Sequence, residues 1–430
     1  MHIIEDYFAI FRRYPVLLSV GVLTFLATAG WAVVLPMLSL YLAEDVGIGT
    51  GFIGLIFGAY AISETILKTP FGIISDHTGQ RPVIIAGLLA ALVVPVLMLW
   101  AYHPVWFLVL QLMNGASIAA FWPIMASFTA VSVDSQDRAT AMTVFNLSYL
   151  LALGIGPALG TFASHAAGTY RISFYLAIAF FSLAVLLALA GLRHRSYGRP
   201  RPDNSRYSDA LREHLLPDIK NYGGIMAQLS FLWQNKTLAA ILSISLLQNF
   251  AIGFLAPIFI LFIKQELGYD LFQTGKAIII PIAIIGVLAL PVGRFSDTIG
   301  KHRAVRAGFL LAAFSILALP RAEQLWQLVT VIGLLGLAYL IAAPAWFAFT
   351  SLYAPRTSTG TAIASVSAVQ SLGFILGPGV GGLLYEKVNP TVPFIGCGVL
   401  LLLCSLLCLI FVNNDAKPGS GHSDDLIKTG

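Results

Sequence analysis

The chain has 430 residues, of which 58% are hydrophobic and 10% are charged, and its formal net charge is +5. Soluble domains carry about 25% charged residues, so this composition excludes an ordinary soluble domain. The apolar residues fall in runs of about 20 or more, long enough to cross a bilayer, and lipid requires such runs to be helices. In chain order the predicted spans are 17–42, 52–73, 82–102, 105–131, 139–163, 172–192, 238–263, 274–293, 304–320, 325–351, 360–383 and 392–412. The sequence therefore predicts an all-α polytopic membrane protein with twelve transmembrane helices.

Basic residues gather on one side of this predicted topology. Of the 25 Lys and Arg residues, nineteen lie in the chain ends or in the loops that follow even-numbered spans. Loops rich in Lys and Arg stay in the cytoplasm, so we expect a protein of the cell membrane with both termini inside. No cleavable signal peptide is expected, because the charged N-terminal segment leads into a span of full length. Since the charge follows topology rather than forming a groove, nucleic acid is not an expected partner.

One long polar segment divides the spans into two groups of six. The predicted organisation is an N-terminal six-helix bundle at 1–192, a cytoplasmic linker at 193–236, a C-terminal six-helix bundle at 237–412 and a cytoplasmic tail at 413–430. All three cysteines, Cys397, Cys404 and Cys408, fall in the last span. Packing is their expected role, and neither a disulfide framework nor a metal site is predicted.

The two groups of spans follow one template. The stretch PFGIISDHTGQRP at 70–82 returns as PVGRFSDTIGKHR at 291–303, a shift of 221 residues. At that shift four prolines of the first half fall on prolines of the second, where chance would give fewer than one. They are Pro36, Pro70, Pro123 and Pro157, which fall on Pro257, Pro291, Pro344 and Pro378. Two parallel repeats of six helices are typical of transporters that bind substrate at the midplane between the halves.

The repeated loop carries a family resemblance. The chain resembles the major facilitator superfamily over nearly its whole length, including the signature G-x-L-a-D-R-x-G-R-K after span 2. The first copy offers Gly72, Asp76, Gly79 and Arg81, and it departs from the signature at His77 and Gln80. The second copy offers Gly293, Asp297, Gly300 and Lys301, and it departs at Thr298 and His302.

The resemblance implies that this loop is a conformational latch, which holds the cytoplasmic side closed and breaks as the halves rock. Glycines allow helix ends to approach closely and to turn sharply. An aspartate at such a junction can accept from free helix amides or pair with a basic residue. Arg138, in the loop before span 5, is the candidate partner of Asp76. The alternative is that the aspartate only caps a static loop.

Spans 5 and 11 carry a second pair of matching elements. GIGPALG at 154–160 and ILGPGVG at 375–381 supply the candidate hinge residues Gly156, Pro157, Gly160, Gly377, Pro378 and Gly381. A proline inside a span removes one backbone hydrogen bond and kinks the helix, and flanking glycines allow close packing. The span 5 element resembles the antiporter motif of drug:proton exporters, although repeat symmetry alone also explains its return in span 11.

Glu64 is the one acidic residue that lies well inside a predicted span. Lys68 follows one turn later, on the same face and in the order that favours an ion pair. An ionisable residue at this depth is costly and is a functional hypothesis by default. Glu64 is therefore a candidate proton carrier whose pKa Lys68 sets, and the alternative is a permanent structural pair with the lysine reaching toward the membrane edge.

Two features of proton-coupled relatives are missing from the sequence. The span 4 pattern R-x-x-Q-G reads QLMNG here, so Gln111 stands where those relatives carry arginine. Span 1 lacks the carboxylate of many cation exporters, which leaves Glu64 as the only counter-ion for a permanent cation. These departures favour neutral or amphipathic substrates.

Polar and aromatic residues in the spans that line the cavity of the family are candidate substrate contacts. Amides are costly in lipid and should face the protein interior, where their alternative role is to bind a neighbouring helix. Together the aromatic residues suggest a large, partly apolar pocket. The candidates are Trp31, Tyr60, Trp122, Asn146, Tyr149, Gln248, Asn249, Trp346 and Gln370.

The first hypothesis is a secondary transporter that exports a small organic or amphipathic compound in exchange for protons by alternating access. The alternative is a facilitator, uptake carrier or flippase for sugars, organic anions or lysolipid-like substrates, since they share the fold. Neither ATP hydrolysis nor intramembrane catalysis is expected, because the sequence lacks a Walker A motif, an H-E-x-x-H motif and a second intramembrane acid. The expected partners are the substrate, protons and the bilayer, and the protein is expected to be a monomer without cofactor or metal.

Overall fold

The computed structural model describes residues 10–192, 236–353 and 359–411, with only the helix assignment for 236–238, 287, 289–299, 344, 347–353, 359–365 and 411. The helices of the N-terminal half are α2 (Val16–Leu40), the π-helix η1 (Tyr41–Asp45), α3 (Thr50–Thr78), α4 (Gln80–Met98), α5 (Pro104–Val131), α6 (Arg138–Ala167) and α7 (Arg171–Gly191). Those of the C-terminal half are α10 (Lys236–Leu255), α11 (Phe259–Gln265), α12 (Leu271–Ile299), α13 (Lys301–Ala318), α14 (Leu325–Tyr353), α15 (Thr359–Lys387) and α16 (Val392–Phe411).

The predicted all-helical membrane fold is confirmed. Among the described residues, eleven helices are long and apolar enough to cross a bilayer. The remaining predicted span corresponds to α12, whose apolar described part is Leu271–Gly286. The predicted linker, apart from Lys236, and the predicted tail lie outside the described residues.

The first span of each half differs at its repeated proline. Pro36 lies inside α2, which continues into η1. Its counterpart Pro257 lies between α10 and α11, so the predicted span 238–263 is broken into two helices. A break is the expected consequence of a missing backbone donor and of a ring that collides with the preceding turn.

Within each half, the first span packs against the fifth and sixth spans: α2 contacts α6 and α7, and α10 contacts α15 and α16. A Cβ added to Gly160 would lie 2.3 Å from the carbonyl oxygen of Val33. In the other half a Cβ added to Gly381 would lie 2.3 Å from the carbonyl oxygen of Phe254, which is the repeat counterpart of Val33. Glycines of the two predicted hinge elements therefore allow the same close backbone contact in both halves.

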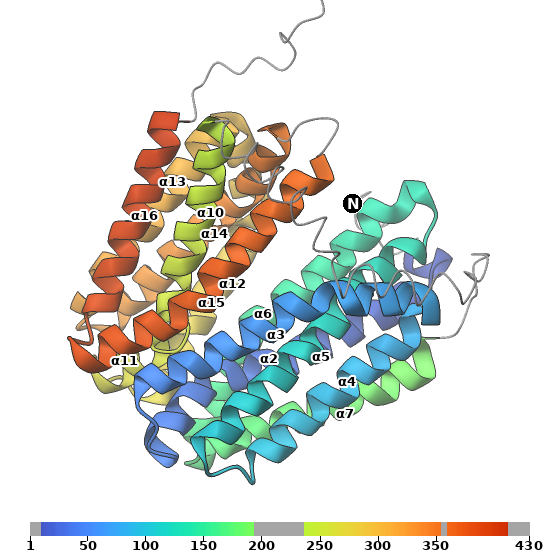
Figure 1. Cartoon of the computed structure of the whole chain (residues 1–430), viewed down its shortest axis with the longest axis horizontal. Coiled ribbons are helices and arrows are strands. Elements are labelled where there is room, and N and C mark those ends of the chain that lie inside the picture. The colour runs from blue at the N-terminus through green and yellow to red at the C-terminus, as the bar shows by residue number, and fades with distance from the viewer. Residues whose placement is uncertain (1–9, 193–235, 354–358, 412–430) are drawn as a thin grey trace, which may run out of the picture.

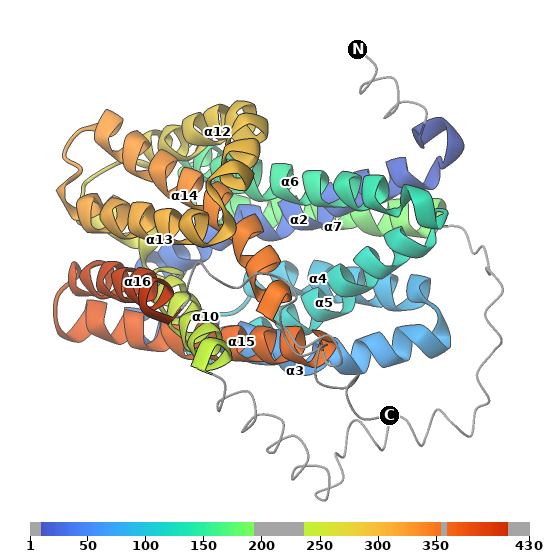
Figure 2. The ribbon, with the colours of Figure 1, turned by 90° about the horizontal axis from the view of Figure 1, so that it is seen from above.

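The two halves meet along two helix pairs, α3 with α15 and α6 with α12. Figure 1 shows the halves as the arms of a V that join near α11, and Figure 2 shows both helix pairs from above. We call the joined side, with the loops at 46–49, 168–170, 266–270 and 388–391, the closed side. The opposite side, at which α3 ends and α6 begins, is the tail side.

Candidate functional site

On the closed side, α3 and α15 touch backbone to backbone. A Cβ added to Gly54 would lie 2.1 Å from the carbonyl oxygen of Pro378, and no side chain but hydrogen fits there. One turn further toward the tail side, a Cβ added to Gly58 would lie 2.9 Å from the carbonyl oxygen of Ile375. Because residues four apart lie on one helix face, this face of α3 stays packed on α15 over successive turns.

The C-terminal half also caps the start of α3. Gly49 occupies the N-cap position and has no side chain to offer. The carboxylate of Glu386, at the end of α15, accepts from the backbone N–H of Gly51 at 2.9 Å. One of the free amides of α3 is thus satisfied across the junction between the halves. Glu386 was not predicted from the sequence. Its signal there is Gly49, because a span that begins after an N-cap glycine needs an acceptor from elsewhere.

Next toward the tail side, an apolar layer joins the two halves. Tyr60 and Ala61 of α3 pack with Ile118 of α5, and this group is bordered by Trp31, Trp122, Phe374 and Ile375. The last two belong to α15. Further toward the tail side, a Cβ added to Gly72 would meet nothing within 4 Å, whereas Phe71 and Ile74 pack against the core of the N-terminal half.

Four of the predicted substrate contacts come together at this layer, and we call Trp31, Tyr60, Trp122 and Tyr149 the aromatic cluster. The rings of Trp31 and Tyr60 lie 6.2 Å apart, and Trp31 meets Trp122 edge-on at 5.6 Å. Tyr149 meets Trp122 edge-on at 5.0 Å. The indole N–H of Trp122 is buried without a hydrogen-bond partner among the described residues. Aromatic rings in such arrangements form a stable apolar surface, and the indole N–H of Trp122 adds a hydrogen-bond donor to it.

Glu64 and Lys68 lie one and two turns beyond Tyr60 on the same helix. The ammonium of Lys68 lies 2.9 Å from the carboxylate of Glu64, and the two side chains are 44% and 18% exposed. Gly115 of α5 allows close approach here, since its added Cβ would lie 2.9 Å from the Glu64 backbone nitrogen. Tyr60 and Tyr149 both lie within electrostatic reach of Glu64. The expected pair is present, and the role of Glu64 as a proton carrier stays a prediction.

The aromatic cluster and the ion pair have no counterparts in the other half. At the shift of 221 residues, Trp31, Tyr60, Trp122 and Tyr149 correspond to Ile252, Pro281, Ala343 and Gln370. Glu64 and Lys68 correspond to Ile285 and Ala289. The shared template therefore repeats the packing glycines and prolines, whereas the aromatic and charged groups belong to the N-terminal half.

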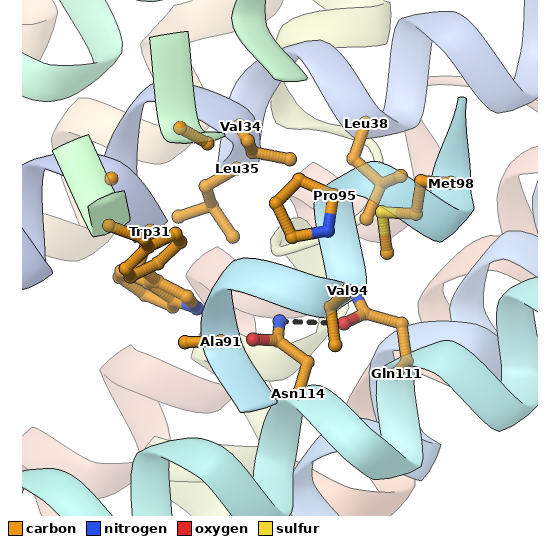
Figure 3. Close-up of a pocket in the computed structure, with 13 residues that line it drawn as sticks. Trp31, Val34, Leu35, Leu38, Ala91, Val94, Pro95, Met98, Gln111 and Asn114 are labelled. Atoms are coloured by element: carbon orange, nitrogen blue, oxygen red, sulfur yellow. Dashed lines mark hydrogen bonds between the residues drawn. The ribbon is translucent and has the colours of Figure 1, made fainter. Parts of the chain in front are cut away.

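A small cavity lies beside Trp31 inside the N-terminal half (Figure 3). Its volume of about 30 Å³ is enough for one water, and its lining includes Pro95, Gln111 and Asn114. The amide of Asn114 donates to the side-chain oxygen of Gln111 at 2.8 Å, and Gln111 is 4% exposed. The position at which proton-coupled relatives carry arginine is thus occupied by a buried amide with a partner.

The remaining predicted substrate contacts lie in different surroundings. Asn146 is exposed, and Gln370 is half-buried. Asn249 donates to the backbone oxygen of Ser245, one turn earlier on α10, whereas the side-chain oxygen of Gln248 is buried without a partner among the described residues. Trp346 is buried in the C-terminal half, with its ring 6.1 Å from that of Phe309. Their contact with substrate stays a prediction.

The predicted latch lies on the tail side. Gly79 and Gly300 both adopt a φ of 91°, so the two copies of the loop turn in the same way, as glycine permits. Arg81 donates to the Leu189 carbonyl oxygen at the end of α7, at 2.8 Å. Asp76 and Arg138 are both exposed, and their contact stays a prediction. For Gly293 and Asp297 the structure describes only the helix assignment.

The predicted hinge elements are continuous helix in the structure. Pro157 lies inside α6 and Pro378 inside α15. A Cβ added to Gly156 would lie 2.6 Å from the Cβ of Ala32, and one added to Gly377 would lie 2.6 Å from the Phe250 carbonyl oxygen. These positions serve close packing within each half, and their bending during transport stays a prediction.

Known proteins share this sequence pattern and fold. The sequence profile of the Major Facilitator Superfamily matches residues 20–254 and 241–428. The chain is 24% identical over 398 residues to the tetracycline resistance protein, class E, of Escherichia coli, covering 90% of this chain and 93% of that protein. It is 22% identical over 399 residues to multidrug resistance protein 2 of Bacillus subtilis (strain 168), covering 91% and 94%.

Solved structures agree on the fold. The nucleoside transporter NupG superposes with a TM-score of 0.69 at 15% identity, covering 92% of this chain and 98% of that one. The human organic anion transporter MFSD10 (TETRAN) superposes with a TM-score of 0.60 at 18% identity, covering 91% and 98%.

Two parallel six-helix repeats that join on one side define a membrane transporter of small substrates rather than an enzyme. The chain belongs to the Major Facilitator Superfamily, and it is a multi-pass integral membrane protein. The predicted resemblance to the drug-efflux branch of the family is confirmed by the relatives it matches.

Proposed function

We propose that this protein exports small organic or amphipathic compounds across the cell membrane in exchange for protons, by alternating access. The observation that carries the proposal is the aromatic cluster beside the Glu64–Lys68 pair, at the layer that joins the two halves. Aromatic faces favour apolar or aromatic substrates, and a carboxylate in a span is the kind of group that carries protons.

The arrangement of the halves corresponds to one step of the proposed cycle. Lys and Arg are concentrated in the chain ends and in the loops of the tail side, so this side is the cytoplasmic one in our proposal. The halves join on the opposite side. In this arrangement an exporter takes up substrate from the cytoplasm or the inner leaflet, and an uptake carrier releases it there, so the proposed direction rests on the relatives.

The relatives support the substrate class. Two of them are named for resistance to tetracycline and to multiple drugs, in Escherichia coli and Bacillus subtilis. Gln111 stands where proton-coupled relatives carry arginine, and span 1 has no carboxylate. Glu64 is therefore the coupling residue of this proposal. In an exchanger, proton and substrate occupy the carrier alternately. Substrate would bind from the cytoplasm while Glu64 is unprotonated and paired with Lys68, and protonation of Glu64 from the other side would accompany substrate release.

A flippase for lysolipid-like molecules is the second candidate. The chain is 24% identical over 356 residues to the proton-coupled antiporter flippase LtaA of Staphylococcus epidermidis, covering 81% of this chain and 82% of that protein. An aromatic cluster can also accommodate an acyl chain. The same assay distinguishes the two candidates by the compound that responds.

The experiment uses purified protein in liposomes that contain a pH-sensitive dye and carry an imposed proton gradient. Lipophilic drugs, sugars and lysolipids are added in turn to wild type, Glu64→Gln and the exposed-loop control Glu323→Gln. Proton-coupled export predicts that one drug-like compound moves protons through wild type and the control, but not through Glu64→Gln. Equal transport by all three proteins would refute the coupling role and favour a facilitator or flippase.

A further inference from the structure

A cluster of polar side chains joins the halves on the closed side, away from the aromatic cluster. Glu44 in η1 lies 2.5 Å from the ammonium of Lys264 in α11. The hydroxyl of Tyr170, in the loop before α7, donates to the same carboxylate at 2.5 Å. Gln265 donates to the other carboxylate oxygen at 3.2 Å, and the Lys264 ammonium also donates to the Tyr170 hydroxyl. Two groups from each half thus converge on one point, and we call these four residues the axis gate.

The repeat explains where this point lies. Glu44 and Gln265 are 221 residues apart, which is the shift that relates the two halves. When two equivalent positions of a twofold repeat touch each other, they must lie close to the axis that relates the repeats. The axis gate therefore lies on the pseudo-twofold axis, at the closed end of the junction between the halves.

At these positions the two halves carry different residues, and their charges and hydrogen-bonding groups are complementary. Glu44 has a neutral amide as its counterpart, and Lys264 corresponds to Ala43. Two carboxylates at the equivalent positions would repel each other on the axis. One carboxylate, with an ammonium and an amide from the other half, instead forms charge-assisted hydrogen bonds.

The protonation state of the tyrosine fits this role. Burial, followed by the hydrogen bond to Glu44, raises the pKa of Tyr170 to about 12. The phenol is therefore protonated at neutral pH and donates to the carboxylate. Tyr170 is held within the N-terminal half, because its ring is part of the buried core around Phe174 and Tyr41.

Water already reaches the axis gate. The side chains of Glu44 and Lys264 are each 28% exposed. A pocket of about 330 Å³ adjoins them, with Lys264 and Tyr170 in its wall together with Asp45, His165 and Asp270. Separated charges would be hydrated at once, so the contact can break without leaving a buried unpaired ion.

We propose that Glu44, Tyr170, Lys264 and Gln265 are gating residues of the transport cycle, which hold the closed side shut and set how often it opens. A contact on the axis is separated by any rocking motion that parts the halves on this side. The gate thus acts directly on the equilibrium between the two orientations of the transporter. It concerns a side of the molecule that neither the loop signature nor the substrate site involves, and it depends on no assumption about substrate or coupling.

The experiment measures the opening of the closed side without substrate. Spin labels are placed on cysteines introduced at Ala166 in the N-terminal half and Glu323 in the C-terminal half, both exposed on that side. The native cysteines are buried, which directs labelling to the new sites. Distance distributions are recorded in lipid nanodiscs for wild type, Glu44→Gln, Lys264→Gln, Tyr170→Phe and the exchanged pair Glu44→Lys with Lys264→Glu.

We expect Glu44→Gln and Lys264→Gln each to raise the ratio of long to short distances by roughly three- to tenfold, as for the loss of a half-exposed charge-assisted network. Tyr170→Phe should give a smaller shift, and the exchanged pair should return the ratio toward wild type. Glu266→Gln, a neighbouring exposed carboxylate, is the matched control and should leave the ratio unchanged. Distances unchanged in both single variants would overturn the proposal, as would an exchanged pair more open than either single variant.

Because no transport is measured, failure of the axis gate leaves the proposed export function untouched. A failed transport assay likewise leaves the distance result standing. Should a single variant unfold, the exchanged pair still decides the question, since it keeps both charges and only reverses their positions.

Discussion

The two helix pairs that join the halves are equivalent in the repeat but are built differently. Between α3 and α15, the backbones touch: a Cβ added to Gly382 would lie 2.2 Å from the Thr50 carbonyl oxygen. Between α6 and α12, the position equivalent to Gly382 is Thr161. There a Cβ added to Gly275 would meet the Phe162 ring at 2.6 Å and the Thr161 hydroxyl at 2.7 Å. The α3–α15 contact joins backbone to backbone, whereas side chains lie between the backbones in the α6–α12 contact.

This difference indicates that the α3–α15 and α6–α12 contacts behave differently as the two halves rock. Backbone contacts lack rotamer freedom, so the α3–α15 contact has one well-defined geometry. Side chains can change rotamer, so the α6–α12 contact can adjust as the halves move. We therefore expect the α3–α15 contact to be the rigid contact, which holds the closed side shut and separates when that side opens, and the α6–α12 contact to be the one that slides.

The largest effect is expected from a larger side chain in the rigid α3–α15 contact. Gly54→Leu adds a side chain where even a Cβ lies 2.1 Å from the Pro378 backbone, and the neighbouring α15 cannot yield locally. Overpacking costs about 1–3 kcal/mol and occasionally more, which would raise the open population by roughly fivefold or more. The distance measurement with labels at Ala166 and Glu323 tests this. The control is Gly286→Ala in α12, where an added Cβ meets nothing within 4 Å. A wild-type distribution for Gly54→Leu would refute the role of the rigid contact in closure.

Much of the fold was predictable from sequence, because lipid leaves few choices. Apolar runs of span length must be helices, and the repeat of Pro36, Pro70, Pro123 and Pro157 predicted the two halves before any contact was known. The break at Pro257 was not predicted, since Pro36 at the same repeat position leaves its helix intact. The difference depends on packing around each proline, which sequence alone does not specify.

The candidate site was less predictable, because helix register decides which side chains meet. Trp122 and Trp346 look alike in sequence, as single tryptophans inside apolar spans. In the structure Trp122 meets Trp31 and Tyr149, whereas Trp346 packs against Phe309 inside the other half. The axis gate was missed because a Glu and a Lys near span ends are ordinary interfacial charges. The shift of 221 residues between Glu44 and Gln265 was a signal that could have joined them.

The next largest effect extends the comparison to these two tryptophans. Trp122→Phe keeps a ring but removes the indole N–H and part of the aromatic surface. We expect the apparent KM for a transported compound to rise roughly tenfold, or about 1.4 kcal/mol of binding, with little change in thermal stability. Trp346→Phe is the matched variant and should lower thermal stability by roughly 1–2 kcal/mol at unchanged KM, because it leaves a gap in a packed core. Transport kinetics and thermal unfolding in nanodiscs separate the two results, and equal KM changes in both variants would contradict the assignment.

A smaller effect is expected from Glu386, which caps the start of α3 from the other half. Glu386→Gln keeps the shape of the side chain but weakens its bond to the Gly51 amide, because the acceptor is no longer charged. Caps contribute about 0.5–2 kcal/mol, and a retained neutral acceptor should cost the low end of that range. The same distance measurement should show the long population rising by only a few-fold. Combining Glu386→Gln with Glu44→Gln should add the two effects, since the residues share no contact partner.

The smallest effect is expected at the α6–α12 contact, and it tests the comparison most directly. Gly275→Ala is equivalent in the repeat to a substitution at Gly54, and its Cβ also has neighbours below 3 Å. The neighbours are the edge of the Phe162 ring and the Thr161 hydroxyl, which are side-chain atoms that can shift, so the cost should stay below about 1 kcal/mol. Phe162→Leu introduces the residue that stands at the equivalent position, Leu383, and should remove the part of this cost that the ring causes. An opening shift for Gly275→Ala as large as that of Gly54→Ala, measured side by side, would mean that both contacts are equally rigid.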